Sequence, residues 1–188
     1  ITFGSFAVVG ALSSHGKTAF ALQANHWVTG IHKLPVAFVS VEMSADELAE
    51  RTIAYASSAP KENWHQLLEK LEYDTKLHFT DAAPSVVIDG LHSLPEIEAA
   101  LIAEFDRGAR VAFVDYAQLI AVPGSEDPNN ATRRVSAALK RLAKEREVII
   151  ILLAQLNKRV ESYPNLTPRL TDIDHGTKLG HDADVVIF

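Results

Sequence analysis

The chain has 188 residues, of which 47% are hydrophobic and 22% are charged, so it can bury a core and is too apolar for intrinsic disorder. It contains no cysteine, which excludes a disulfide framework, a thiolate metal site and a cysteine nucleophile. The net charge is −6, and no signal peptide or membrane-spanning run is present, so the sequence predicts a cytoplasmic protein with no membrane segment.

Short β-branched runs alternate with helical patterns along the whole chain. The helices are predicted at residues 18–29, 45–58, 60–71, 94–106 and 131–145. The buried strands are predicted at residues 6–10, 37–41, 111–115 and 148–154, with weaker strands at 76–79 and 86–88. This alternation is typical of an α/β domain with a mostly parallel sheet and helices on both faces.

The two ends and the connections bear on domain organisation. We find no internal repeat and no domain boundary, so we expect one domain over residues 1–188. The chain opens on Ile1 and stops inside an apolar run at 185–188 that is typical of a buried strand. We interpret this as a fragment of a longer protein. A turn-rich loop is expected at 124–130.

Charge is distributed unevenly. Residues 1–130 carry 8 basic and 17 acidic side chains, whereas residues 131–170 carry 9 basic and 3 acidic ones. The acidic total argues against a protein that coats nucleic acid. The basic stretch is compatible with a surface that faces a polyanion and equally with a solvated helix face.

A glycine-rich loop follows the first predicted strand and precedes a helix. The pattern G-x-x-x-x-G-K-[ST] has Ala11 at its first glycine, while Gly16, Lys17 and Thr18 fill the end that contacts phosphate. A chance glycine-rich turn is the alternative, but the strand before the loop and the helix after it are what the motif requires. The loop therefore predicts nucleotide binding.

Each part of this loop has an expected task. Backbone N–H groups of Ser14, His15 and Gly16 would point at phosphate oxygens. Lys17 would reach the β- and γ-phosphates of ATP, and the Thr18 hydroxyl would bind Mg²⁺.

Polar residues also stand at the ends of other predicted strands. Asp115 could hold the Mg²⁺ of a nucleotide, Glu42 could orient the attacking water, and Gln155 could sense the γ-phosphate. Taken singly, an acid that starts a turn, an acid that caps a helix and an amide that satisfies nearby backbone are equally ordinary roles. As a set beside a phosphate-binding loop, they favour ATP hydrolysis over binding alone.

Several blocks, in order along the chain, resemble the DnaB family of replicative helicases. They are Val41-Glu42-Met43-Ser44, Val114-Asp115-Tyr116-Ala117-Gln118-Leu119, Gln155-Leu156-Asn157-Lys158-Arg159-Val160-Glu161 and Asp182-Ala183-Asp184-Val185-Val186. The resemblance covers nearly the whole chain. It implies a RecA-like motor domain, without the family's N-terminal domain and without the segment that supplies its arginine finger.

The resemblance implies an ATP-dependent DNA helicase that forms a hexameric ring and pulls single-stranded DNA through its channel. Lys17 and Thr18 would be the Walker A pair, Glu42 the catalytic glutamate, Asp115 the Walker B acid and Gln155 the γ-phosphate sensor. ATP and Mg²⁺ are the implied cofactors, and a helicase loader and a primase are further implied partners.

One block departs from the family pattern. Where the family has an Arg-Glu pair that helps to hold the DNA backbone, this chain has Asp174-His175, and Lys178 is a candidate to compensate. Lys158 and Arg159 closely follow the sensor glutamine and are the better candidate phosphate contacts.

Arg169 is a further candidate that is equally explained as a solvated charge. The departure keeps a second hypothesis open, namely a related RecA-like ATPase that acts in recombination or assembly without unwinding. A nucleotide-binding module that only oligomerises is a third hypothesis, and the complete set of polar strand ends argues against it.

Overall fold

The computed structural model describes residues 1–57 and 82–188, so the predicted helix at 60–71 and strand at 76–79 lie outside it. A six-stranded sheet in the order β3-β2-β4-β5-β1-β6, with every neighbouring pair parallel, forms the centre. The strands are β1 (Phe6–Ala11), β2 (Val36–Ser40), β3 (Ser85–Ile88), β4 (Val111–Asp115), β5 (Ile149–Gln155) and β6 (Val185–Ile187). The predicted α/β fold with a parallel sheet is confirmed.

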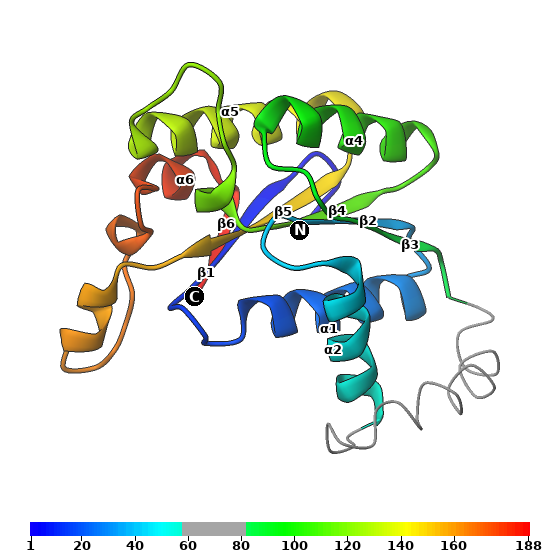
Figure 1. The fold of residues 1–188 in the computed structure, drawn as a ribbon, viewed down its shortest axis with the longest axis horizontal. Coiled ribbons are helices and arrows are strands. Elements are labelled where there is room, and N and C mark those ends of the chain that lie inside the picture. Colours follow the sequence, from blue (N-terminus) through cyan, green and yellow to red (C-terminus); the bar gives the residue numbers. More distant parts are fainter. Residues whose placement is uncertain (58–81) are drawn as a thin grey trace.

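Helices cover both faces of the sheet (Figure 1). One face carries α1 (Lys17–Gly30) and α2 (Ala45–Ser57), and the other carries α4 (Leu94–Asp106), α5 (Pro128–Arg146) and α6 (Thr177–Asp182). Short 3₁₀ turns follow two of the strands and occupy the connection before α6: η2 (Ala117–Leu119), η3 (Lys158–Ser162) and η4 (Leu170–Asp172). None of the described helices is both long and apolar enough to cross a membrane.

Burial on both faces explains why the central strands are apolar throughout. In β4, Ala112 and Val114 pack toward α4 and α5, while Val111 and Phe113 pack toward α1 and α2. Phe113 stacks on Phe38 of β2 with ring centroids 5.7 Å apart. Each strand therefore contributes to two cores, which is the reason for unbroken β-branched runs.

Besides shifts of one residue at several element ends, two features differ from the sequence prediction. The Asp127 carboxylate accepts hydrogen bonds from the N–H groups of Asn129 and Asn130, so α5 begins at Pro128 and the predicted loop at 124–130 is shorter. Val185–Ile187 of the run at 185–188 forms β6, but this strand pairs only with β1 within the described chain and is half-exposed. The prediction that this run is a buried strand is therefore wrong: it lies at the edge of the sheet.

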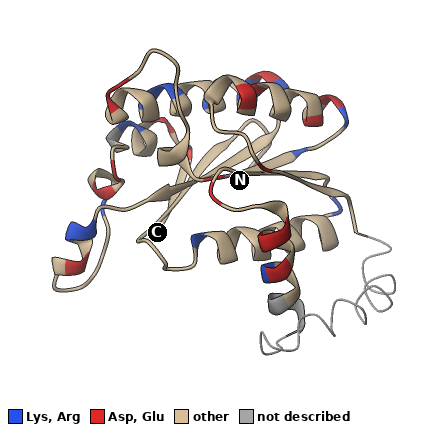
Figure 2. Ribbon diagram, viewed as in Figure 1, with Lys and Arg blue, Asp and Glu red and all other residues tan. Residues whose placement is uncertain are grey.

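The basic stretch lies mainly on α5 (Figure 2), and three of the six basic side chains of this helix form ion pairs within the described residues. The ion pairs are Lys140 with Asp184, Arg141 with Glu98 and Glu145, and Arg146 with Asp106. Because carboxylates from α4 and from the approach to β6 neutralise these charges, α5 fits a solvated, ion-paired helix face better than a polyanion-binding surface.

The carboxyl ends of the strands gather the predicted functional residues at one edge of the sheet. Ser40 lies opposite Asp115 in the β2–β4 register, which brings Glu42 to this edge. Ala11 lies opposite Gln155 in the β1–β5 register, so the phosphate loop and the sensor glutamine are neighbours. This is the edge at which open α/β sheets bind ligands.

Candidate nucleotide and DNA site

The phosphate loop spans the gap between β1 and α1. Gly16 has φ +83°, a left-handed conformation that glycine adopts without strain, and α1 begins directly after it at Lys17. Ser14 also has a positive φ of 61° and is exposed. The loop therefore wraps tightly ahead of the helix, as the sequence predicts.

Thr18 and Asp115 form a buried pair beneath this loop. Thr18 Oγ1 donates to Asp115 Oδ2 over 2.6 Å, and the other carboxylate oxygen, Oδ1, is buried with no partner in the described residues. Burial raises the pKa of Asp115; the hydrogen bond from Thr18 opposes this, and the nearby Glu42 charge adds to it. A hydroxyl beside a carboxylate with a free oxygen suits a hard cation such as Mg²⁺, which prefers oxygen ligands.

A polar cavity of about 340 Å³ lies above this pair. Six of the predicted residues line it, from the phosphate loop, the start of α1 and the ends of two strands: Ser14, Gly16, Lys17, Thr18, Glu42 and Gln155. Lys17 Nζ lies 5.3 Å from the centroid of the Tyr116 ring, within cation–π range. Glu42 is exposed to the cavity, whereas Lys17 is buried. The structure thus brings a cation, a carboxylate and an amide to one space that is open to solvent.

Other residues of the cavity were not predicted. Ser13, Met43, Arg51 and Tyr116 also line it. Tyr116 directly follows Asp115 and could have been found by adjacency; burial, and then the charges of Glu42 and Asp115, raise the pKa of its hydroxyl. Arg51 lies on α2, and only the packing of that helix brings it to the cavity.

His15 occupies a different place from the other loop residues. Its side chain lines a second, largely apolar cavity of about 610 Å³, together with Leu156 and Phe188. Its Nδ1 lies 2.8 Å from the Ser13 carbonyl oxygen, and its backbone N–H donates to the Leu12 carbonyl over 3.2 Å. The His15 ring therefore lies beside the phosphate cavity and does not line it.

The candidate DNA residues follow β5. Arg159 Nε donates to Asp172 Oδ1 over 2.8 Å, and Tyr163 Oη donates to the same oxygen over 2.9 Å. Burial opposes ionisation of Asp172, but hydrogen bonds from the Arg169 N–H, Tyr163 and Arg159 outweigh it and lower the pKa of the carboxyl. Asp172 thus holds the segment after β5 folded, and Arg159 is half-exposed and ion-paired.

Lys158 and Lys178 differ from Arg159. Both are exposed and form no ion pair within the described part of the chain. The Arg169 guanidinium lies 5.5 Å from the Tyr163 ring centroid. Of the predicted phosphate contacts in the described residues, Arg159 is the one in an ion pair, Arg169 lies over an aromatic ring, and the two lysines have neither contact.

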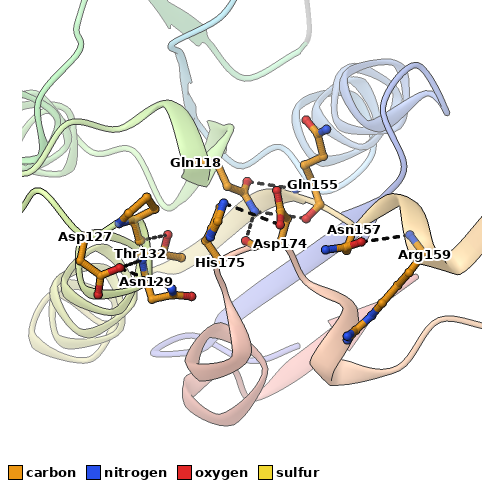
Figure 3. A network of polar contacts seen from close by, with 10 residues as sticks. Gln118, Asp127, Asn129, Thr132, Gln155, Asn157, Arg159, Asp174 and His175 are labelled. Atoms are coloured by element: carbon orange, nitrogen blue, oxygen red, sulfur yellow. Dashed lines mark hydrogen bonds and ion pairs between the residues drawn. The ribbon is translucent and has the colours of Figure 1, made fainter.

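The departing block forms a tight turn next to β5. The Asp174 N–H donates to the Gln155 carbonyl over 2.8 Å, and His175 is exposed with φ +48°. His175 Nε2 lies 3.8 Å from Asp174 Oδ1 (Figure 3). Gln118, which was not predicted as functional, contacts the backbone of both Gln155 and Asp174.

Comparison with known proteins finds relatives over nearly the whole chain. The chain is 31% identical to a probable plasmid replicative DNA helicase of Chlamydia trachomatis and 31% identical to the replicative DNA helicase DnaB of Geobacillus stearothermophilus. These alignments cover 98% and 96% of this chain, but only 42% of each relative, so the chain spans less than half the length of these proteins.

Solved structures share the fold. A structure described as an ATPase domain superposes with a TM-score of 0.85 at 26% identity, covering 99% of this chain and 69% of that one. A DnaB-like replicative helicase, described with its interactions with primase, superposes with a TM-score of 0.83 at 26% identity, covering 98% and 46%. The model of the DnaB-like helicase C-terminal domain matches residues 2–188, and the chain belongs to that family.

Proposed function

We propose that this chain is the ATP-hydrolysing motor domain of a hexameric replicative DNA helicase, which translocates on single-stranded DNA and unwinds duplex. The observation that carries the proposal is the cavity in which Lys17, Glu42 and Gln155 meet above the Thr18–Asp115 pair. Family membership adds the substrate class, because the curated relatives are replicative DNA helicases.

Each residue of the cavity has a different expected role in ATP binding and hydrolysis. Lys17 offers positive charge to the β- and γ-phosphates, and Glu42 orients and partly deprotonates the attacking water. Gln155 donates its amide to the γ-phosphate and loses that partner after hydrolysis. Backbone N–H groups of Ser14 and Gly16 complete the phosphate cradle.

Magnesium fits the buried pair. The unpartnered Oδ1 of Asp115 and the Thr18 hydroxyl supply oxygen ligands, directly or through water. When bound, Mg²⁺ neutralises charge that develops on the phosphates. The role of the protein is to keep Asp115 ionised although burial raises its pKa, and the nearby Lys17 charge favours the ionised form.

Contact with single-stranded DNA is assigned to the segments after β5. Exposed Lys158 and Lys178 would meet phosphates, whereas Arg159 would act mainly through its pairing with Asp172. An Asp174 side chain near DNA would repel phosphate. Binding of the DNA backbone would then depend on the lysines and on backbone N–H groups at the turn.

Assembly completes the proposal. ATP would lie between neighbouring subunits of a ring, with the arginine finger supplied from outside this chain. A primase is a proposed partner because a structural relative is described with one, and a helicase loader is a second. The replication machinery of a bacterium, phage or plasmid would place the protein in the cytoplasm.

The test measures ATP turnover and DNA binding by the full-length protein. We expect oligo-dT to stimulate turnover. We also expect Lys158→Ala and Lys178→Ala each to lower the slope of log affinity against log salt by about one. Lys144→Ala, which removes an exposed charge from α5, is the matched control and should leave the slope unchanged. Turnover that ignores DNA in an intact ring would refute the proposal.

A further inference from the structure

Gln118 uses both ends of its side-chain amide to hold backbone groups. The Gln155 N–H donates to Gln118 Oε1 over 3.0 Å. Gln118 Nε2 donates to the carbonyl oxygens of Gln155 over 3.1 Å and of Asp174 over 2.7 Å. One side chain on η2 therefore joins the end of β5 to the turn that carries Asp174 (Figure 3).

The bridge lies where the sheet itself has stopped. The β4–β5 register ends with Val114 opposite Leu152, so beyond this point the Gln118 side chain replaces backbone pairing between the two segments. On its other side, β5 is tied to the phosphate loop, since the Leu156 N–H donates to the Ala11 carbonyl over 2.9 Å. The Gln155 peptide is thus held between the phosphate loop and the turn at 173–178.

The side chain and the backbone of Gln155 contact different parts of the site. Its side chain lines the phosphate cavity and points away from Gln118 and Asp174, while its backbone faces them (Figure 3). Gln118 itself is not among the residues that line that cavity. A displacement of Gln155 when its γ-phosphate partner is lost would therefore reach Asp174 by two routes, through Gln118 and through the direct hydrogen bond from the Asp174 N–H to the Gln155 carbonyl.

The turn at 173–178 is closely packed around Gly176. A Cβ on Gly176 would lie 2.5 Å from Ile173 Cγ2 and 2.9 Å from Leu179 Cδ1, so the turn is tightly packed on itself. The bonds from β5 and Gln118 reach only the backbone of Asp174, which explains how its side chain can depart from the family pattern without breaking the bridge.

We propose that Gln118 is a positioning residue that couples the γ-phosphate state at Gln155 to the placement of the DNA-facing turn at 173–178. Gln118 does not line the phosphate cavity, and its amide bonds to backbone groups. The inference rests on the proposed function, because the turn meets DNA only if the chain is a motor on single-stranded DNA. Couplings between sites typically amount to about 5- to 150-fold.

Two variants of the full-length protein test this. Gln118→Glu keeps the acceptor for the Gln155 N–H but sets a carboxylate oxygen against two carbonyls, and Gln118→Leu removes all three bonds. Gln23→Glu and Gln23→Leu, at an exposed position on α1, are the matched controls. The measurements are ATP turnover with and without oligo-dT, and oligo-dT affinity with ATPγS and with ADP.

We expect both ratios, turnover with DNA over turnover without and affinity with ATPγS over affinity with ADP, to fall by about tenfold in the Gln118 variants. The controls should keep the wild-type ratios. A merely structural role would lower both turnover rates in proportion and leave the ratio unchanged, which would overturn the inference. Gln118→Glu preserves volume, so it decides the matter if Gln118→Leu does not fold.

The wild-type arm separates the two proposals. A wild-type protein that responds to oligo-dT, beside a Gln118→Glu protein that responds equally, overturns the inference alone. A wild-type protein whose turnover ignores oligo-dT refutes the proposed function and the inference with it.

Discussion

Replacing Asp115 by asparagine should separate the stability of the nucleotide-free protein from its affinity for Mg·ATP. The Asp115 carboxylate is fully buried, with one oxygen bonded to Thr18 and the other without a partner in the described residues. A buried polar atom left unpaired costs about 1–3 kcal/mol. Because Asp115→Asn removes the buried charge, we expect the free energy of unfolding without nucleotide to rise by about 1 kcal/mol at pH 7.

The direction of the Asp115 pKa shift determines whether its contribution to stability rises or falls with pH. Burial, reinforced by Glu42, raises the pKa of Asp115 in the folded protein, although Thr18 opposes the shift. The folded protein then binds a proton more readily than the unfolded chain. The contribution of Asp115 to wild-type stability therefore falls as the pH rises from the unfolded pKa of about 3.9 through the folded value. The stability gap between Asp115→Asn and wild type should be wider at pH 7 than at pH 4 in urea unfolding.

With bound nucleotide, we expect wild type to be more stable than Asp115→Asn. A ligand at about 100 times its Kd stabilises a protein by about 2.7 kcal/mol, and each tenfold loss of affinity removes about 1.4 kcal/mol of this. We expect Asp115→Asn to lose at least about tenfold in affinity for Mg·ATPγS, measured as the gain in unfolding free energy on adding the ligand. A variant that is less stable without nucleotide and keeps the full gain would refute this account of the buried pair.

Further substitutions test the other parts. Lys17→Ala should abolish binding of a fluorescent ATP analogue. Glu42→Gln should keep binding and lose about 10²- to 10⁴-fold in turnover, because Glu42 acts mainly in the transition state; full turnover in an intact ring would contradict its role. Asp172→Ala removes a buried carboxylate that accepts hydrogen bonds from Arg159, Tyr163 and the Arg169 N–H, and it should lower the free energy of unfolding by about 2 kcal/mol in urea denaturation; no change would mean that these bonds do not hold the segment folded. Gly176→Ala sets a Cβ 2.5 Å from Ile173 Cγ2 and should lower stability by about 1–3 kcal/mol; an unchanged Tm would contradict the tight turn.

The sequence predicts the central strands well because they are apolar on both faces. The strand at 111–115 matches β4 in full, and the strand at 148–154 is displaced by one residue from β5. Periodicity says less about β6, since an apolar run does not reveal whether both sides of the strand are paired. The start of α5 was missed for a local reason: Asp127 and Pro128 are a capping pair that also fits a turn.

The site residues also divide into those that the sequence predicts and those that only the tertiary structure reveals. The phosphate loop is a continuous motif, so Lys17 and Thr18 follow from the sequence, and strand ends place Asp115 beside them. Arg51 and Gln118 were missed because they reach the site through tertiary packing of α2 and η2. Adjacency to Gln155 predicts Arg159 as a DNA contact, but adjacency cannot show that the chain folds back and pairs Arg159 with Asp172.

Strand displacement by the full-length protein tests the central claim most directly. The measurement follows release of a labelled strand from a forked DNA duplex, with Mg·ATP and with Mg·ATPγS, for wild type and Glu42→Gln. We predict that wild type releases the strand only with ATP and that Glu42→Gln binds the fork without releasing it. ATP hydrolysis by an intact wild-type ring with no strand released, whichever arm of the fork carries the single-stranded tail, would contradict the account.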